Sequence, residues 1–220
     1  MASGPRRQPA AGRPRHDVVR RVGERHVPEF SLVLPVELSD LHRLFREAHR
    51  LTGHAEFVVV GSLAALGAPR EGNLPARMIL SIDVDAYTKA DPARIFELQS
   101  ALGQGSAFEM AHGYYLDPVS PALPTLPDGW EGRLYRIAFG DGIVAHFLDP
   151  NDAAVSKYAR CEPRDREWLR AGLAAGILSA PIIEYRMRET VFADDEERQR
   201  ATEAFVQDRS RARASGRKGR

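Results

Sequence analysis

An apolar run, a glycine–serine pair and a second apolar run follow one another in the stretch EFVVVGSLAAL, residues 56–66. The first run is rich in β-branched and aromatic residues, which predicts a buried strand. Gly61 permits a tight turn, and Ser62 is of a residue type that caps the N-terminus of a helix. We therefore expect a strand, a turn and a helix, whose first backbone N–H groups are free to bind phosphate oxygens.

A second strand is predicted over the run MILSIDVD, residues 78–85, which ends in two aspartates. Alternation along a strand places Asp83 and Asp85 on one face, about 7 Å apart. Two carboxylates held this close raise each other's pKa unless a cation or a proton lies between them. Mg²⁺ suits this position because it binds carboxylate oxygens and completes its coordination with water and substrate phosphates. The pair therefore predicts a metal site beside a phosphate-bearing ligand.

Each of these motifs also has an ordinary structural interpretation. A glycine–serine turn from strand to helix is common chain punctuation. An Asp-x-Asp pair at a strand end is more often solvated, or caps a neighbouring helix. The combined order of strand, Gly61-Ser62, helix, strand and Asp83-x-Asp85 is more specific than either motif alone.

This order resembles the signature of the nucleotidyltransferase superfamily, in which glycine and serine hold a triphosphate and two or three carboxylates bind divalent metal. Other stretches are similar to an uncharacterised bacterial family of nucleotidyltransferase-like proteins, related to the abortive-infection AbiEii toxins of type IV toxin–antitoxin systems. These stretches are residues 106–115, 126–134, 148–152 and 156–160, with Arg164-Asp165. The resemblance covers roughly residues 38–179.

The resemblance implies transfer of a nucleoside monophosphate from a Mg²⁺-bound nucleoside triphosphate to an acceptor, RNA or protein. It also implies a cognate antitoxin as a possible partner. Gly61 and Ser62 correspond to the turn that binds the triphosphate. Asp83 and Asp85 correspond to the metal-binding and catalytic pair.

Two cations are candidate phosphate partners. The resemblance matches Lys157 to a helix lysine of the AbiEii relatives, which implies both a catalytic and a nucleotide-binding role. On a helix that begins near residue 151, Lys157 and Arg160 fall at helical spacing and can point together into a cleft. The ordinary alternative for Lys157 is a solvated helix residue.

Two departures from the superfamily pattern concern spacing and the third carboxylate. Ser62 and Asp83 are separated by 20 residues, against about a dozen in the superfamily, and the extra length falls in a loop over residues 67–75. On the next apolar run, His146 lies in the middle and Asp149 lies at the end, before a proline that equally suits the start of a helix. A third carboxylate is not evident from the sequence. The alternative is therefore a catalytically degenerate protein that binds a nucleotide or a protein partner without turnover.

A histidine and two tyrosines form a further candidate group. The pair Tyr114-Tyr115 predicts a strand, and a lone histidine such as His112 is most often packed or hydrogen-bonded for structural reasons. His112 is therefore a minor candidate, with no role implied by the resemblance.

The whole pattern predicts an α/β or α+β domain over residues 27–192, with a mixed sheet flanked by helices and a helical C-terminal part. An amphipathic helix over residues 38–51 ends at Gly53, and another helix begins at Asp91-Pro92. Two strands joined by Gly140-Asp141-Gly142 predict a hairpin. Further helices are expected from about residues 152, 163, 181 and 194.

Composition favours a cytoplasmic protein without a membrane segment. The chain of 220 residues is 43% hydrophobic, which is enough for one domain with a real core. It has no apolar run near the roughly 18 residues that a membrane helix needs, and its start shows no signal-peptide core. The single cysteine, Cys161, cannot form an internal disulfide.

The near-zero net charge hides an acidic body with basic ends. Residues 1–26 carry seven Arg and two acids, and residues 209–220 carry five Arg, one Lys and no acid. The remainder therefore has a net charge of −10. We expect a disordered basic tail over residues 1–26, and a charged helix followed by a basic disordered tail over residues 193–220. Such tails can bind RNA, although a purely solubilising role is favoured because the body is acidic.

Overall fold

Five strands form one mixed sheet in the order β3-β2-β1-β5-β4. The computed structural model describes Met1 and residues 35–69 and 72–218, so the predicted tail over residues 1–26 lies almost wholly outside the described residues. Strand β1 pairs antiparallel with β2 and parallel with β5, while β2 pairs parallel with β3 and β4 pairs antiparallel with β5. The strands are β1 (Glu56–Val59), β2 (Asp83–Thr88), β3 (Tyr115–Pro118), β4 (Tyr135–Ala138) and β5 (Val144–Phe147). The predicted α/β class is confirmed.

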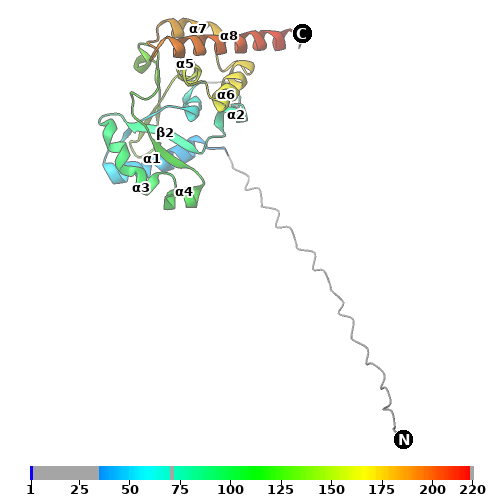
Figure 1. The fold of residues 1–220 in the computed structure, drawn as a ribbon. Coiled ribbons are helices and arrows are strands. Elements are labelled where there is room, and N and C mark those ends of the chain that lie inside the picture. Colours follow the sequence, from blue (N-terminus) through cyan, green and yellow to red (C-terminus); the bar gives the residue numbers. More distant parts are fainter. Residues whose placement is uncertain (2–34, 70–71, 219–220) are drawn as a thin grey trace. The chain divides into compact units, whose positions relative to one another are not determined.

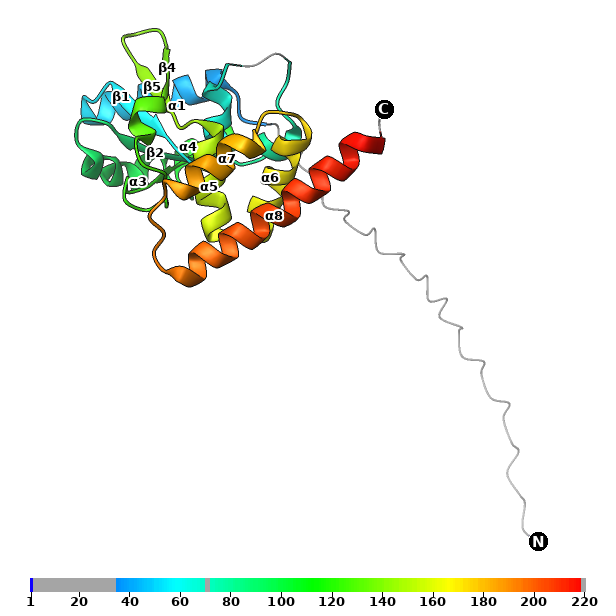
Figure 2. The same cartoon turned by 90° about the horizontal axis from the view of Figure 1, so that it is seen from above.

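Helices flank this sheet, and α1, α3 and α4 lie on the opposite side of it from the C-terminal helices (Figure 1). Figure 2 shows α8 running alongside α5 and α6, against which it packs. The helices of the first group are α1 (Leu38–Thr52), α3 (Gln99–Leu102) and α4 (Ala107–His112). Those of the C-terminal group are α5 (Pro150–Arg160), α6 (Pro163–Ala174), α7 (Ala180–Arg188) and α8 (Asp195–Lys218).

Helix α1 forms as its amphipathic pattern predicts. Leu41, Leu44, Phe45 and Ala48 are fully buried, and Phe45 stacks on Phe57 of β1 with ring centroids 4.5 Å apart. The helix ends at its C-cap glycine in the left-handed conformation, as expected. One apolar stripe thus fixes α1 against the sheet.

The strand predicted over residues 78–85 is wrong in its first half. The segment forms the short helix α2 (Ala76–Ile79) instead, and β2 begins only at Asp83. Met78 is fully buried, and its carbonyl accepts a hydrogen bond of 3.2 Å from the indole nitrogen of Trp168 on α6. Met78 therefore packs against α6, and the two aspartates lie in the first half of β2 rather than at the end of a strand.

Other predicted elements form with altered boundaries. The expected hairpin of β4 and β5 is present, and Asp141 has a positive φ in its turn. The helix expected after Asp91 is split into a 3₁₀ helix, η2 (Pro92–Leu98), and the α-helix α3. Another 3₁₀ helix, η3 (Trp130–Arg133), precedes β4, which begins at Tyr135.

Helix α8 is longer than the sequence suggested. It runs to Lys218 and so includes most of the basic segment that was predicted to be a disordered tail. Its Arg209 forms a 2.8 Å ion pair with Glu184 of α7 and lies over the ring of Phe205, and these contacts extend helical order into the basic segment. In the described residues, no helix combines the length and the apolar character needed to span a membrane.

Candidate functional site

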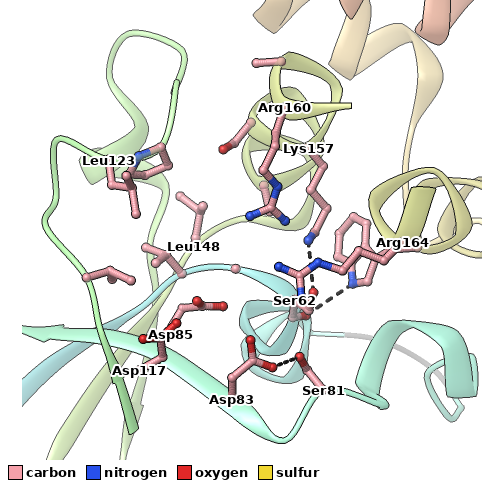
Figure 3. Close-up of a pocket in the computed structure, with 18 of the residues that line it drawn as sticks. Ser62, Ser81, Asp83, Asp85, Asp117, Leu123, Leu148, Lys157, Arg160 and Arg164 are labelled. Carbon is pink, nitrogen blue, oxygen red and sulfur yellow. Dashed lines mark hydrogen bonds between the residues drawn. The ribbon is translucent and has the colours of Figure 1, made fainter. Parts of the chain in front are cut away.

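A cavity of about 820 Å³ brings together side chains that are far apart in the sequence. Its walls come from the turn after β1, the first half of β2, the end of β3 with the loop that follows it, and helices α5, α6 and α8. Figure 3 shows that carboxylates lie on the strand side of this cavity, while cations reach it from the helices. The charged and polar residues around it include Gly61, Ser62, Asp83, Asp85, Asp117, Lys157, Arg160 and Arg164.

Three carboxylates converge on one face of the sheet. Asp83 and Asp85 alternate on β2, and the parallel pairing of β2 with β3 places Asp117 directly beside Asp85. One oxygen of each carboxylate lies within 4.8 Å of the others. Asp83 also accepts a hydrogen bond from the Ser81 hydroxyl. The strand register thus builds a compact acidic triad.

The electrostatics of the triad indicate strong mutual repulsion. Burial, followed by the charges of Asp83 and Asp117, raises the pKa of Asp85 to about 7. Burial and the Asp83 charge also raise the pKa of Asp117. The triad therefore favours either a shared proton or a bound cation.

The donor set fits a divalent metal ion. All three ligands are hard carboxylate oxygens, which suit Mg²⁺ and Mn²⁺ better than softer metals. A divalent cation would offset the burial and the mutual repulsion that raise the pKa values of Asp85 and Asp117. The triad therefore has both the chemistry and the spacing that a metal centre requires.

The turn after β1 is tightly fitted to the triad. Gly61 has φ +66°, and a Cβ added at this position would lie 1.8 Å from Asp85 Oδ2. Ser62 does not cap a helix as predicted, because Gly61 occupies the cap position and Ser62 is the first residue of η1 (Ser62–Gly67). This element is a 3₁₀ helix of six residues, too short for the dipole of a long α-helix to contribute much. Any anion at this turn must rely mainly on side chains.

Lys157 supplies the nearest such side chain. It is buried on α5, and its ammonium donates a 3.0 Å hydrogen bond to Ser62 Oγ and a 3.2 Å hydrogen bond to Asp165 Oδ1. The ammonium also lies 5.1 Å from the centroid of the Trp168 ring. Burial and the adjacent Arg160 lower the pKa of Lys157, while Asp165 opposes this shift. Lys157 is therefore not the solvated helix residue of the ordinary interpretation.

Two arginines line the cavity beside Lys157. Arg160 forms two short hydrogen bonds to Asp165, of 2.8 and 2.6 Å, and remains half exposed toward the cavity. Arg164 is more exposed and pairs with Glu162 at 3.3 Å. Its positive charge partly opposes the rise that burial causes in the pKa of Asp117. The helix side of the cavity is thus cationic opposite an anionic strand side.

A family described as "Nucleotidyltransferase of unknown function (DUF6036)" matches residues 39–214 of the chain. The chain belongs to this family. Comparison with curated proteins and with solved structures gave no significant match. Family membership supports a nucleotidyltransferase-type activity and suggests a nucleotide substrate and a divalent metal. The relationship to the AbiEii toxins stays a prediction.

In this nucleotidyltransferase family member, the third carboxylate was not evident from the sequence, and neither Asp149 nor His146 supplies it. Asp149 caps α5 by accepting a 2.8 Å hydrogen bond from Asn151 N, and it pairs with Arg186. His146 lies 2.8 Å from Glu56 through its ring nitrogen. Both residues serve local structure, and Asp117 of β3 takes the third position.

Asp117 carries a signal that sequence reasoning overlooked. Asp117 lies two positions after Tyr115, near the end of the strand that the pair Tyr114-Tyr115 predicts. His112 is exposed at the end of α4, where it contacts Phe108 and Tyr114, and α4 lies across the sheet from α5 (Figure 1). The stretch around His112 that resembles the family thus leads into β3. His112 itself does not line the cavity.

Proposed function

We propose that the protein transfers a nucleoside monophosphate from a Mg²⁺-bound nucleoside triphosphate to a hydroxyl group on an RNA or protein acceptor. The observation that carries this proposal is that the triad of carboxylates and the cations Lys157, Arg160 and Arg164 line one cavity. Asp83, Asp85 and Asp117 would hold the metal. Ser62, Lys157, Arg160 and Arg164 would hold the triphosphate. Family membership supports the reaction class.

Each group has a role that follows from its position. The metal ion, when bound, neutralises charge on the triphosphate and lowers the pKa of the attacking hydroxyl. Lys157 orients the Ser62 hydroxyl and places a positive charge beside it. Arg160 is held by Asp165 in a fixed orientation at the cavity wall, where it can bind phosphate oxygens without a large entropic cost.

The proposed step is an in-line displacement at the α-phosphorus. A bond forms between the acceptor oxygen and this phosphorus, and the bond to the bridging oxygen of pyrophosphate breaks. The acceptor's proton passes to solvent, and pyrophosphate leaves. Arg160 and Arg164 stabilise the charge that develops on the leaving group.

Asp83→Asn tests this proposal. Each of the four nucleoside triphosphates is added with and without Mg²⁺, and thermal unfolding and pyrophosphate release are measured. At 100 times its dissociation constant, a ligand stabilises the wild type by about 2.7 kcal/mol, which is visible as a rise in Tm. The matched control is Asp141→Asn, since Asp141 lies in an exposed hairpin turn whose positive φ asparagine tolerates.

Three outcomes separate the candidate functions. A Mg²⁺-dependent rise in Tm with pyrophosphate release, both lost in Asp83→Asn alone, supports the enzyme. The same rise in Tm, without pyrophosphate release on any acceptor, supports the alternative of a nucleotide-binding protein without turnover. The presence of Asp117 in the triad weakens this alternative, which was based on the lack of an evident third carboxylate. No rise in Tm in any of the three proteins refutes both functions, and a rise that Asp83→Asn leaves unchanged refutes the proposed metal site.

A toxin–antitoxin role and a cytoplasmic location, where nucleoside triphosphates are made, are finer parts of the proposal. Both rest on the resemblance and on composition. Growth arrest on expression, lost in Asp83→Asn and relieved by a co-expressed partner protein, is the result expected of a toxin. Normal growth with an active enzyme contradicts the toxin role and leaves the transferase proposal standing.

A further inference from the structure

In the proposed function, the triad holds the metal and the cations hold the phosphates. One end of the cavity then has no role. This end lies between the loop that follows β3 and the start of α5. Its walls are apolar or small: Val119, Leu123, Pro124, Leu148 and Ala153. In the view of Figure 3, Leu123 and Leu148 lie across the cavity from Arg164. We call this part of the cavity the apolar end, although Thr125 and Glu197 also line the cavity beside the same loop.

Leu123 is the most unusual residue of this apolar end. Its side chain is 72% exposed, although it lines the cavity. Its backbone is held in a turn, because Leu123 N donates a 3.0 Å hydrogen bond to Ser120 O and Ala122 N donates a 3.3 Å hydrogen bond to Ser120 Oγ. A large apolar side chain that is fixed at a cavity rim gains free energy when a ligand covers it.

The loop that carries Leu123 is also anchored farther along. Pro127 forms a bridge with Thr190, Asp128 N donates a 3.0 Å hydrogen bond to Glu189 O, and Thr125 Oγ1 donates a 3.3 Å hydrogen bond to Glu197. These contacts tie the loop to the segment that enters α8. Leu123 is thus presented by a loop that is attached at both ends, so little ordering is required on binding.

We propose that this apolar end binds the nucleoside part of the substrate, with Leu123 covering one face of the base. This inference rests on the proposed function. It extends that function by assigning a binding site to the nucleoside part of the substrate. A nucleoside triphosphate has a polyanionic triphosphate, which suits the cations of the cavity. Its base has flat, apolar faces, which suit the apolar walls. Base faces pack well against apolar side chains. The short side chain of Ala153 on the α5 wall leaves room for a ring.

A comparison of two ligands tests this assignment. Dissociation constants are measured by calorimetry for each Mg²⁺–nucleoside triphosphate and for Mg²⁺–tripolyphosphate, which has the phosphates but no nucleoside. We expect Leu123→Ala to weaken nucleotide binding about tenfold and to leave tripolyphosphate binding unchanged. Leu123→Phe, which keeps an apolar face, should bind nucleotides as tightly as the wild type. The control is Met110→Ala, since Met110 is 79% exposed on α4.

The outcomes separate this inference from the function on which it rests. Equal effects of Leu123→Ala on both ligands, or no effect on either, overturn the nucleoside site while Asp83-dependent binding keeps the proposed function. Wild-type protein that binds tripolyphosphate as tightly as nucleotides also overturns it. Nucleotide binding that is absent, or is the same in Asp83→Asn, refutes the proposed function and the inference with it.

Discussion

Gly61 leaves no space for any side chain beside Asp85. Two independent features require glycine at this position: its φ of +66°, and the distance of only 1.8 Å that would separate an added Cβ from Asp85 Oδ2. The glycine thus does more than permit a turn. It lets one carboxylate of the triad lie directly against the backbone of the turn after β1.

Gly61→Ala should therefore disturb the triad as well as the turn. The added methyl group must push Asp85 aside, so we expect Mg²⁺-dependent nucleotide binding to fall at least about tenfold, with a stability loss of about 1–3 kcal/mol. Calorimetric titration and urea unfolding measure the two effects. The matched control is Gly113→Ala, because Gly113 has φ +78° but a Cβ added there would have no atom within 4 Å. Equal loss of binding in both variants would contradict the proposed contact with Asp85.

At the scale of elements, one buried carboxylate joins α6 to α8. Asp208 is fully buried on α8, and it accepts hydrogen bonds of 2.8 and 2.9 Å from Arg166 and one of 2.8 Å from Arg170. Tyr158 of α5 also packs edge-on against Phe205 of α8, with centroids 5.6 Å apart. Helix α8 is therefore held in place by both ion pairs and packing. The same contacts hold the part of the cavity wall that α8 forms.

Asp208→Asn should destabilise the fold by about 2 kcal/mol at pH 7, because it removes the charge that two arginines bind. Burial alone would raise the pKa of Asp208, but the hydrogen bonds from Arg166 and Arg170 lower it. A lowered native pKa contributes stability above the unfolded value of about 4, and that stability is lost as pH falls through the native pKa. Urea unfolding at several pH values should therefore show the wild type and the variant converging below about pH 4.

The control for this prediction lies on the same helix. Glu203 is an exposed residue of α8 that accepts a hydrogen bond from Gln199, so Glu203→Gln should change stability by less than about 0.5 kcal/mol. A pH-independent difference between Asp208→Asn and the wild type would mean that lost packing, rather than lost charge, explains the destabilisation.

At the scale of the whole molecule, the site depends on long-range pairing. The residues that line it come from the turn at 61–62, from β2 and β3, and from α5 and α6. Strand β1 joins these parts, since it pairs with β2 on one side and with β5, which leads into α5, on the other. Loss of the core should therefore remove the site and the fold together.

Phe57→Ala tests this coupling at the centre of the sheet. Phe57 is fully buried and stacks on Phe45, so we expect a loss of about 3–5 kcal/mol in the free energy of unfolding. Urea titrations followed by circular dichroism and by nucleotide binding should give coincident transitions in the wild type and in the variant. Binding lost well before helical signal would show instead that the C-terminal helices unfold separately from the sheet.

The local elements of the fold follow from signals that lie within a few residues of one another. The amphipathic stripe of α1, the glycine that ends it and the hairpin turn at Asp141 all depend on neighbouring residues, and all were predicted. The turn at Gly61 and the alternation of Asp83 and Asp85 were also predicted, whereas Ser62 does not cap a helix as expected. Periodicity and turn chemistry act within a few residues, so they can be read without the fold.

Contacts between groups that are distant in the sequence come from strand pairing and core packing. The parallel register of β2 and β3 places Asp117 beside Asp85, and no local pattern encodes that pairing. Burial against α6 made a helix of the segment around Met78, where alternation favoured a strand. Packing likewise buried Lys157 against Ser62, Asp165 and Trp168, although a lysine on a helix is most often solvated. Strand pairing and core packing are long-range, so they exist only once the chain has folded.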